Sequence, residues 1–345
     1  MKSLNVIGLS IAASVTLAIG FFLTHVFLAT NGRRAEPVEV RVEHGDSLAA
    51  AARKLREQNA IASERLFILW ARLRGVDKRI HQGLYRIEAG EAPNEILERL
   101  VTGRGLFHTV TIAEGLTVLE IAELLAKLEI ADREKFLAEA ANPELLHALG
   151  LGQHGIEGYL FPSTYNFIPQ SPEREIILTM AEQFRKVAQP FLAQRDDNLA
   201  LSPHEILTLA SMIEKETGVE SERPLVSAVF HNRLKRQMPM QSDPTVIYGL
   251  KNFTGNLTRK DLRDPSPYNT YRIAALPPGP ICNPGISSIK AALNPADVSY
   301  LYFVSKNDGT HVFSHTLEEH NRAVRMYQPV RQPANAHSKA AARRR

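Results

Sequence analysis

Near its N-terminus the chain carries a long stretch without a single charge. Residues 4–29, LNVIGLSIAASVTLAIGFFLTHVFLA, contain no Asp, Glu, Lys or Arg. A helix of about 20 apolar residues crosses the hydrocarbon core of a bilayer. The stretch exceeds the apolar part of a cleaved signal peptide. The sequence therefore predicts an uncleaved, single-pass transmembrane anchor within residues 1–34.

Charged residues flank this stretch on both sides. Lys2 precedes it, and Arg33 and Arg34 follow it. Because basic residues stay in the cytoplasm, Lys2 favours a cytoplasmic N-terminus, whereas Arg33 and Arg34 favour the opposite orientation. We expect the body of the chain to lie outside the cytoplasmic membrane.

The remaining sequence has an ordinary globular composition. At 345 residues, 44% of them hydrophobic, the chain is long enough for two or three domains with their own cores. The net charge is only +4 and no basic stripe alternates with aromatic residues, so nucleic acid is a poor partner. A single cysteine, Cys282, excludes an intramolecular disulfide. His311 and His315 fit a hairpin better than a metal site, so neither metal nor cofactor is expected.

Residues 38–102 show the pattern of a compact mixed unit. VEVRVEHGDSL alternates like a half-buried strand and ends at Ser47, which can cap a helix. Two helices, a short strand GLYRI and a third helix closed by Gly103 follow. A strand at 107–112 and a helix at 119–128 begin the next segment.

Residues 156–167, IEGYLFPSTYNF, concentrate aromatic rings beside polar groups. Rings stack on the C–H faces of sugars while carboxylates and amides bind hydroxyls, so Glu157 and Tyr159 are candidates for a sugar-binding surface. A loop that packs its aromatic side chains on the core is the alternative interpretation.

A helix at 204–217 ends in the run EKE. Glu216 is predicted beside Ile213 and Met212, in the last turn before the expected stop at Gly218. Apolar neighbours and the helix C-terminus both raise a carboxyl pKa, which suits a general acid acting on a glycosidic oxygen. Glu214 lies beside small residues and has no comparable reason for a raised pKa. The alternative is that EKE forms a solvated charged surface.

The C-terminal third is rich in loops. Ordered long loops such as QSDPTVIYG and PSPYNTYRIAALPPGPICNPG are commonly functional. YLYFVS and HVFS flank the turn 307–309 and predict a hairpin. Residues 331–345 form a basic tail that we expect to be disordered.

Several of these segments, in this order, resemble the YceG-like (MltG-type) family of bacterial endolytic murein transglycosylases. The segments are IEGYLFPSTYNF, ASMIEKETGVESERPLVSAVFHNRL, MQSDPTVIYG, PYNTYRIAALPPGPICNPG and YLYFVSKNDGTHVFS. The resemblance covers nearly the whole chain.

The resemblance implies an α+β protein with an N-terminal transmembrane helix. It places a LysM-like glycan-binding α/β subdomain at 35–106, a connecting strand-helix segment at 107–156, and a mixed α+β catalytic domain with a lysozyme-like catalytic helix at 157–330. The catalytic residue would be Glu216, followed by Thr217 where related enzymes have Ser. Residues expected to bind substrate are Glu157, Tyr159, Gln241, Ser242, Asp243, Tyr268, Asn269 and Tyr271.

The resemblance also implies a lytic transglycosylase. It would cleave the β-1,4 bond between N-acetylmuramic acid and N-acetylglucosamine within nascent peptidoglycan strands and form a 1,6-anhydro end. We expect a single-pass protein of the bacterial inner membrane, with a periplasmic body and peptidoglycan synthases as possible partners. Two alternatives remain open: an inverting muramidase-type hydrolase, with Asp243 or Glu157 positioning water, and a non-catalytic peptidoglycan-binding scaffold.

Overall fold

The computed structural model describes residues 14–22, 24, 36–43, 45–152, 154–169, 171–194, 201–250, 253 and 255–328. Residues 14–22 and 24 are helical, and the rest of the predicted anchor lies outside the described residues. No helix within the described part of the chain is long and apolar enough to span a membrane. The predicted tail at 331–345 also lies outside the described residues.

The chain divides into two compact units. Unit 1 comprises Met1–Val110 and Asn166–Ser171, and unit 2 comprises Thr111–Tyr165 and Pro172–Arg345. The helices and small sheets of both units confirm a mixed α+β fold.

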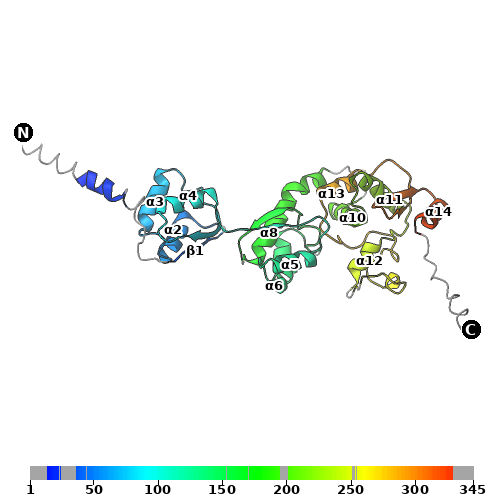
Figure 1. The fold of residues 1–345 in the computed structure, drawn as a ribbon. Coiled ribbons are helices and arrows are strands. Elements are labelled where there is room, and N and C mark those ends of the chain that lie inside the picture. The colour runs from blue at the N-terminus through cyan, green and yellow to red at the C-terminus, as the bar shows by residue number, and fades with distance from the viewer. Residues whose placement is uncertain are drawn as a thin grey trace, which may run out of the picture. The chain divides into compact units, whose positions relative to one another are not determined.

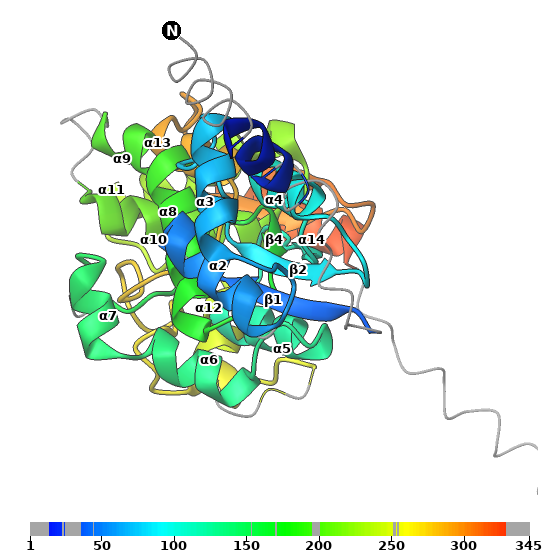
Figure 2. The same cartoon turned by 90° about the vertical axis from the view of Figure 1, so that its left-hand side faces the viewer.

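Unit 1 is built on an antiparallel strand pair with helices between and after the strands. The strands lie side by side in Figure 2, and Val40 pairs with Tyr85. The elements in chain order are β1 (Val38–Val42), α2 (Leu48–Glu57), α3 (Glu64–Leu73), β2 (Gly83–Ile87) and α4 (Pro93–Thr102).

Local sequence signals explain these elements. Ser47 Oγ accepts a hydrogen bond from Ala50 N at 3.2 Å and caps α2, as predicted. Gly103 ends α4 with φ of 67°, which glycine adopts without steric cost. Leu55 of α2 and Leu97 of α4 are fully buried, so both helices contribute to one core.

Two paired strands run through both units. They are β3 (His108–Thr111) and β4 (Thr164–Phe167). In unit 1, Thr109 Oγ1 donates to Asn166 Oδ1 at 2.8 Å. In unit 2, the hydroxyls of Thr111 and Thr164 share a hydrogen bond of 2.9 Å.

Unit 2 is mainly helical and is packed around α10 (Pro203–Glu216). Figure 1 shows α10 between α13 on one side and α12 on the other. The remaining elements are α5 (Val118–Lys127), α6 (Arg133–Ala140), α7 (Pro143–Ala148), α8 (Glu173–Val187), α9 (Gln189–Ala193), the 3₁₀ helix η1 (Glu220–Glu222), α11 (Arg223–Lys235), α12 (Asp243–Gly249), the 3₁₀ helix η2 (Asp261–Arg263), α13 (Ile286–Leu293), β5 (Tyr302–Ser305), β6 (His311–Ser314) and α14 (Leu317–Tyr327).

The predicted C-terminal hairpin is confirmed. Strands β5 and β6 pair antiparallel, with Val304 opposite Val312. In the turn, Asn307 and Gly309 both have positive φ. His311 lies on β6 and contacts Glu222 through its ring Nδ1 at 2.8 Å, so this side chain ties the hairpin to η1.

Candidate active site

Helix α10 begins with a capping box, and its central residues are buried. Glu205 N donates to Ser202 Oγ at 3.3 Å, and Ser202 N donates to the Glu205 carboxylate at 2.7 Å. All residues from 206 to 213 are buried. The sequence predicted one apolar face, but α13, α11 and α12 pack around α10, so every face of this segment is covered.

The helix ends at Glu216, one residue before its predicted end, and Gly218 is not the residue that ends it. Thr217 is the C-cap in an extended conformation, with φ of −144°. Its Oγ1 accepts a hydrogen bond from Val219 N at 3.0 Å. The Thr217 hydroxyl therefore accepts a backbone hydrogen bond in the turn that follows α10. Gly218 does not adopt the left-handed conformation expected of a glycine that ends a helix.

Glu216 is partly buried and accepts a hydrogen bond from Ser242 Oγ at 2.5 Å. Burial raises the pKa of Glu216 to about 7. The hydrogen bond from Ser242 and the positive charge of Arg233 lower the pKa, whereas the negative charge of Asp243 raises it. A carboxyl group with this pKa can both donate and accept a proton near neutral pH.

The segment before α12 places Ser242 against Glu216. Gln241 has φ of 53°, and its backbone N donates to Thr270 O at 3.1 Å. Ser242 N donates to Thr270 Oγ1 at 3.0 Å. Although Ser242 precedes the first residue of α12, its hydroxyl makes no helix-capping bond. The Ser242 hydroxyl is therefore free of a capping role and donates its hydrogen bond to Glu216.

Asp243 and Tyr271 form a second polar pair near Glu216. Tyr271 Oη donates to Asp243 Oδ1 at 2.6 Å. Asp243 is exposed and Tyr271 is partly buried. Burial raises the pKa of both Glu216 and Tyr271, and the charge of Asp243 raises both further. Five of the predicted residues therefore gather here: Glu216, Gln241, Ser242, Asp243 and Tyr271.

Asn269 lies close in sequence but has a supporting position. Its side chain is fully buried, and Nδ2 donates to Leu262 O at 3.2 Å and to Asp264 O at 2.8 Å. Its Oδ1 accepts from Tyr271 N at 3.0 Å. These bonds use both ends of the amide, so Asn269 shapes the loop that presents Tyr271.

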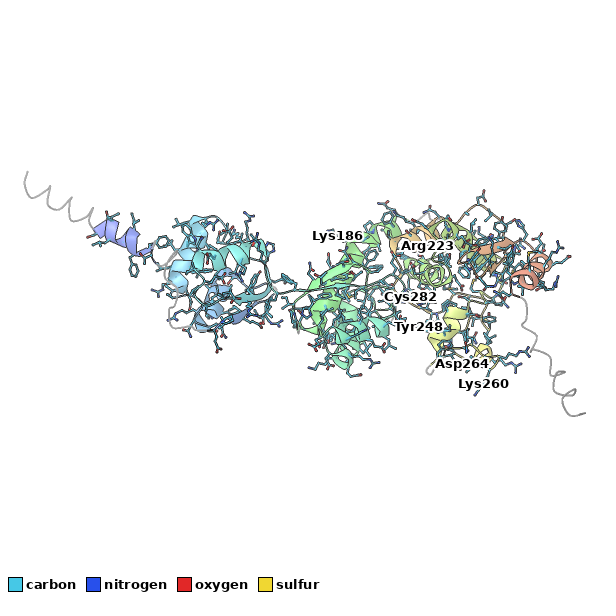
Figure 3. The ribbon with its side chains drawn as sticks, viewed as in Figure 1. Lys186, Arg223, Tyr248, Lys260, Asp264 and Cys282 are labelled. Atoms are coloured by element: carbon cyan, nitrogen blue, oxygen red, sulfur yellow. The ribbon has the colours of Figure 1, made fainter. Side chains whose placement is uncertain are left out.

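Glu157 lies at the other end of α12. Its carboxylate accepts from Val118 N at 3.1 Å, from Asn283 Nδ2 at 3.0 Å and from Tyr248 Oη at 3.2 Å. Burial raises the pKa of Glu157 to about 7. Figure 3 shows Tyr248 and Cys282 in this part of unit 2. Tyr268 packs against Tyr248, with ring centroids 4.9 Å apart.

The aromatic segment that contains Tyr159 packs mostly on the core. Phe161, Tyr165 and Phe167 are each less than 8% exposed. Tyr159 is partly exposed, and its Oη shares a hydrogen bond of 2.9 Å with His204 Nδ1. The packed-loop interpretation therefore describes most of this segment.

Tyr159 also lines a cavity of about 300 Å³. Phe184, Leu192 and Pro203 are among the other lining residues. The residues around Glu216 do not line this cavity. This cavity is therefore separate from the Glu216 carboxyl group.

Glu214 is not part of a solvated charged surface. Its side chain is only 7% exposed, and its Oε1 lies 3.2 Å from Arg223 Nη2. Its Oε2 accepts from Gly285 N at 2.9 Å. Glu214 therefore ties α10 to α11 and to the start of α13, and the solvated alternative for EKE is wrong at this position.

Sequence reasoning missed Arg233 and Thr270. The Arg233 guanidinium is buried, and it donates to Leu301 O at 2.7 Å and to Met240 O at 2.8 Å. Its position three residues after the buried Phe230 was a signal, because that spacing follows the buried face of α11. Thr270 had no local signal, since its role depends on a loop from elsewhere in the chain.

These features define a two-unit α+β protein with a titrating carboxyl group at the end of a buried helix. The YceG-like family model matches residues 40–326, so the chain belongs to the YceG-like family. It is similar to a Bacillus subtilis protein named endolytic murein transglycosylase, with 34% identity over 84% of this chain and 84% of the relative.

Two further proteins extend the comparison. A Streptococcus pneumoniae protein, also named endolytic murein transglycosylase, is 27% identical over 83% of this chain, which spans 58% of that relative. A crystal structure of a yceG-like protein from Listeria monocytogenes has a TM-score of 0.56 and 31% identity, and the match covers 84% of this chain and 99% of that one.

Proposed function

We propose that this chain is a membrane-anchored endolytic murein transglycosylase. It cleaves the β-1,4 bond between N-acetylmuramic acid and N-acetylglucosamine inside nascent glycan strands and leaves a 1,6-anhydro end. The observation that carries the proposal is Glu216, a helix-end carboxyl group with a pKa of about 7 that accepts a hydrogen bond from Ser242. The names of the relatives support the same reaction.

A single carboxyl group suffices for this reaction. Protonated Glu216 donates its proton to the glycosidic oxygen while the bond from that oxygen to C1 breaks. The 6-hydroxyl of the same muramyl residue attacks C1, and ionised Glu216 accepts the hydroxyl proton. Because the proton returns to Glu216, the enzyme is regenerated without water as a reactant.

The neighbours of Glu216 have distinct roles in this scheme. Ser242 holds the carboxylate in one orientation, and the negative charge of Asp243 adds to the rise in pKa that burial causes. Gln241, Asp243 and Tyr271 contact the sugars next to the scissile bond. Tyr159, Tyr268 and Glu157 are proposed to serve more distant sugars, and α10 corresponds to the catalytic helix of lysozyme-like enzymes.

Unit 1 is proposed to be a LysM-like glycan-binding module. The order strand, helix, helix, strand from β1 to β2 supports this assignment. Such a module increases the local concentration of long strands at the catalytic unit. Deleting it should reduce activity on long strands more than on short soluble ones. Equal loss on both, in a folded remainder, contradicts the binding role.

Residues 4–29 are proposed to anchor the protein in the inner membrane with the body in the periplasm, beside peptidoglycan synthases. Lys2 before the uncharged stretch supports this orientation. Protease added to intact spheroplasts should degrade the body. Protection of the body together with a cytoplasmic control protein contradicts the proposed orientation.

The decisive experiment is mass spectrometry of purified peptidoglycan strands after digestion with the full chain. Products with 1,6-anhydro ends from the strand interior are expected. Reducing ends in their place identify an inverting hydrolase, and binding without cleavage identifies a scaffold. Either of those results overturns the proposed reaction.

A further inference from the structure

We propose that the outer face of α3 in unit 1 is a lipid-binding surface that lies on the anionic headgroups of a membrane. We call this surface the α3 face and define it by Arg65, Leu69, Trp70, Arg72 and Leu73. The inference goes beyond the proposed reaction and rests on the proposed membrane anchor.

The first support is apolar exposure on an otherwise well-packed helix. Leu69 and Leu73 are 46% and 65% exposed and lie one turn apart, at i and i+4. Phe67 and Ala71 on the opposite side of α3 are buried in the core of unit 1. Helix α3 is therefore apolar on two sides, and among the described residues the side with Leu69 and Leu73 remains exposed.

Trp70 lies between these two sides and is held in place. It is partly buried against the core of unit 1, and its ring Nε1 donates to Asn94 Oδ1 at 3.1 Å. Arg74 lies 6.0 Å from the ring centroid. Tryptophan is enriched where a membrane meets water, because the ring is apolar and its N–H is polar.

The second support is charge. Residues 64–79 contain five basic and only two acidic side chains. Arg65, Arg72, Lys78 and Arg79 are exposed. Exposed leucines flanked by arginine are typical of helices that lie in the membrane interface, because the leucines enter the acyl region and the cations meet anionic headgroups.

The third support is the position of the α3 face relative to the uncharged stretch. The rings of Phe22 and Trp70 meet edge to face, with centroids 6.2 Å apart. Figures 1 and 2 both show the N-terminal helical residues beside α3. A span that starts near residue 4 and needs about 20 residues places Phe22 near the outer membrane surface. Trp70 then lies at the depth that tryptophan favours.

A second copy of the chain fits this surface less well. In a symmetric dimer the same patch faces itself, so Arg65 and Arg72 would lie close to identical cations. Like charges across an interface are unfavourable. Anionic lipid complements both the charge and the apolar character of the α3 face.

The chain offers a direct probe, because Trp70 is its only tryptophan. The full chain is reconstituted in vesicles of phosphatidylcholine with phosphatidylglycerol, prepared with ordinary or brominated acyl chains. We expect brominated lipid to quench Trp70 emission, most strongly when bromine is near the carbonyl end, since interfacial helices lie about 5–10 Å below the headgroups. We expect weaker quenching in phosphatidylcholine alone.

Substitutions on the α3 face have matched controls in unit 1. Leu69→Asp with Leu73→Asp should abolish the quenching, whereas Leu106→Asp, at another exposed leucine, should leave it unchanged. Arg72→Glu should remove the dependence on phosphatidylglycerol, whereas Arg53→Glu on α2 should not. Circular dichroism and anhydro-product formation should stay at parental levels in all four variants.

The outcomes separate the two proposals. Equal Trp70 emission in ordinary and brominated vesicles, for a chain that floats with the vesicles, overturns the lipid-binding surface and leaves the anchor standing. Failure to float with vesicles overturns the anchor and the lipid-binding surface together. Shielding of Trp70 only in a dimeric fraction assigns the surface to a second copy and also overturns the inference.

Discussion

Ser242 Oγ donates a hydrogen bond of 2.5 Å to Glu216 Oε1, and this contact joins the start of α12 to the end of α10. Hydrogen bonding to a carboxylate favours its charged form, while burial favours its neutral form. The pKa of Glu216, about 7, is the balance of these effects with the charges of Asp243 and Arg233. The contact therefore keeps the pKa of Glu216 lower than burial and the charge of Asp243 would otherwise make it.

Replacing Glu216 with Gln tests the assignment of the catalytic acid. The substitution keeps the size of the side chain and removes the transferable proton, so cleavage should fall by about two orders of magnitude or more. Anhydro-ended product measured by mass spectrometry gives the rate, and thermal unfolding confirms the fold. Near-parental activity of Glu216→Gln contradicts the assignment.

Glu214→Gln is the matched control, since it makes the same substitution two residues earlier on α10. The substitution weakens the buried contact with Arg223, so the free energy of unfolding should fall by about 1–3 kcal/mol. The melting temperature should fall with it. Activity per folded molecule should stay close to the parent. A folded Glu214→Gln protein without activity would reverse the roles of the two glutamates.

The raised pKa of Glu216 also predicts how stability depends on pH. The ordinary value is 4.5 and the folded value is about 7, so the folded state holds a proton that the unfolded state releases between these values. The parent should therefore lose stability as pH rises through this window. Glu216→Gln lacks this loss and should be more stable than the parent above pH 7, by on the order of 1–3 kcal/mol.

Urea unfolding of both proteins at a series of pH values measures this difference. Glu157 titrates in the same window, but it is present in both proteins and cancels in the comparison. A constant difference between parent and variant across the window would show that the pKa of Glu216 is not raised.

Ser242→Ala should change the pH profile of cleavage in a defined direction. The hydrogen bond from Ser242 lowers the pKa of Glu216, so its loss should raise that pKa further, by about one unit. The alkaline limb of kcat/KM should move to higher pH. Ser287→Ala removes a serine hydroxyl that bonds Glu220, away from Glu216, and should leave the profile unchanged.

The sequence was sufficient to predict the helix-end position and the apolar surroundings of Glu216, because these features are local. Apolar residues at helical spacing run into a helix end, and both are visible within 14 residues, the length of α10. Burial, which the apolar neighbours led us to expect, is the largest cause of the raised pKa of Glu216. The charge of Asp243, which comes from another helix, is a further cause.

Long-range partners limited the rest of the prediction. The pairing of Ser242 with Glu216 depends on a loop that Arg233 and Thr270 hold in place. The buried contacts of Glu214 could not be predicted from the sequence, because its partners, Arg223 and Gly285, lie on other segments. Helical periodicity reports which face of one helix is apolar, but it cannot report that other helices cover every face of α10.

Asp243→Asn separates the proposed reaction from its nearest rival. If Asp243 acts through charge, its removal should lower the pKa of Glu216 and move the alkaline limb of kcat/KM to lower pH, opposite to Ser242→Ala. The product should keep its 1,6-anhydro end. Asp264→Asn, at a carboxylate that accepts from Ser266 N in the loop after η2, is the control and should leave the limb in place.

An inverting hydrolase predicts a different result for the same variant. If Asp243 positions the attacking water as the second carboxylate, Asp243→Asn should lose activity by about two orders of magnitude or more at every pH. The parent would then release reducing ends. The hydrolase is excluded if Asp243→Asn still cleaves, forms a 1,6-anhydro end and has the alkaline limb of kcat/KM at lower pH. An enzyme that had lost its general base would not give these three results, so they require a single acid–base group.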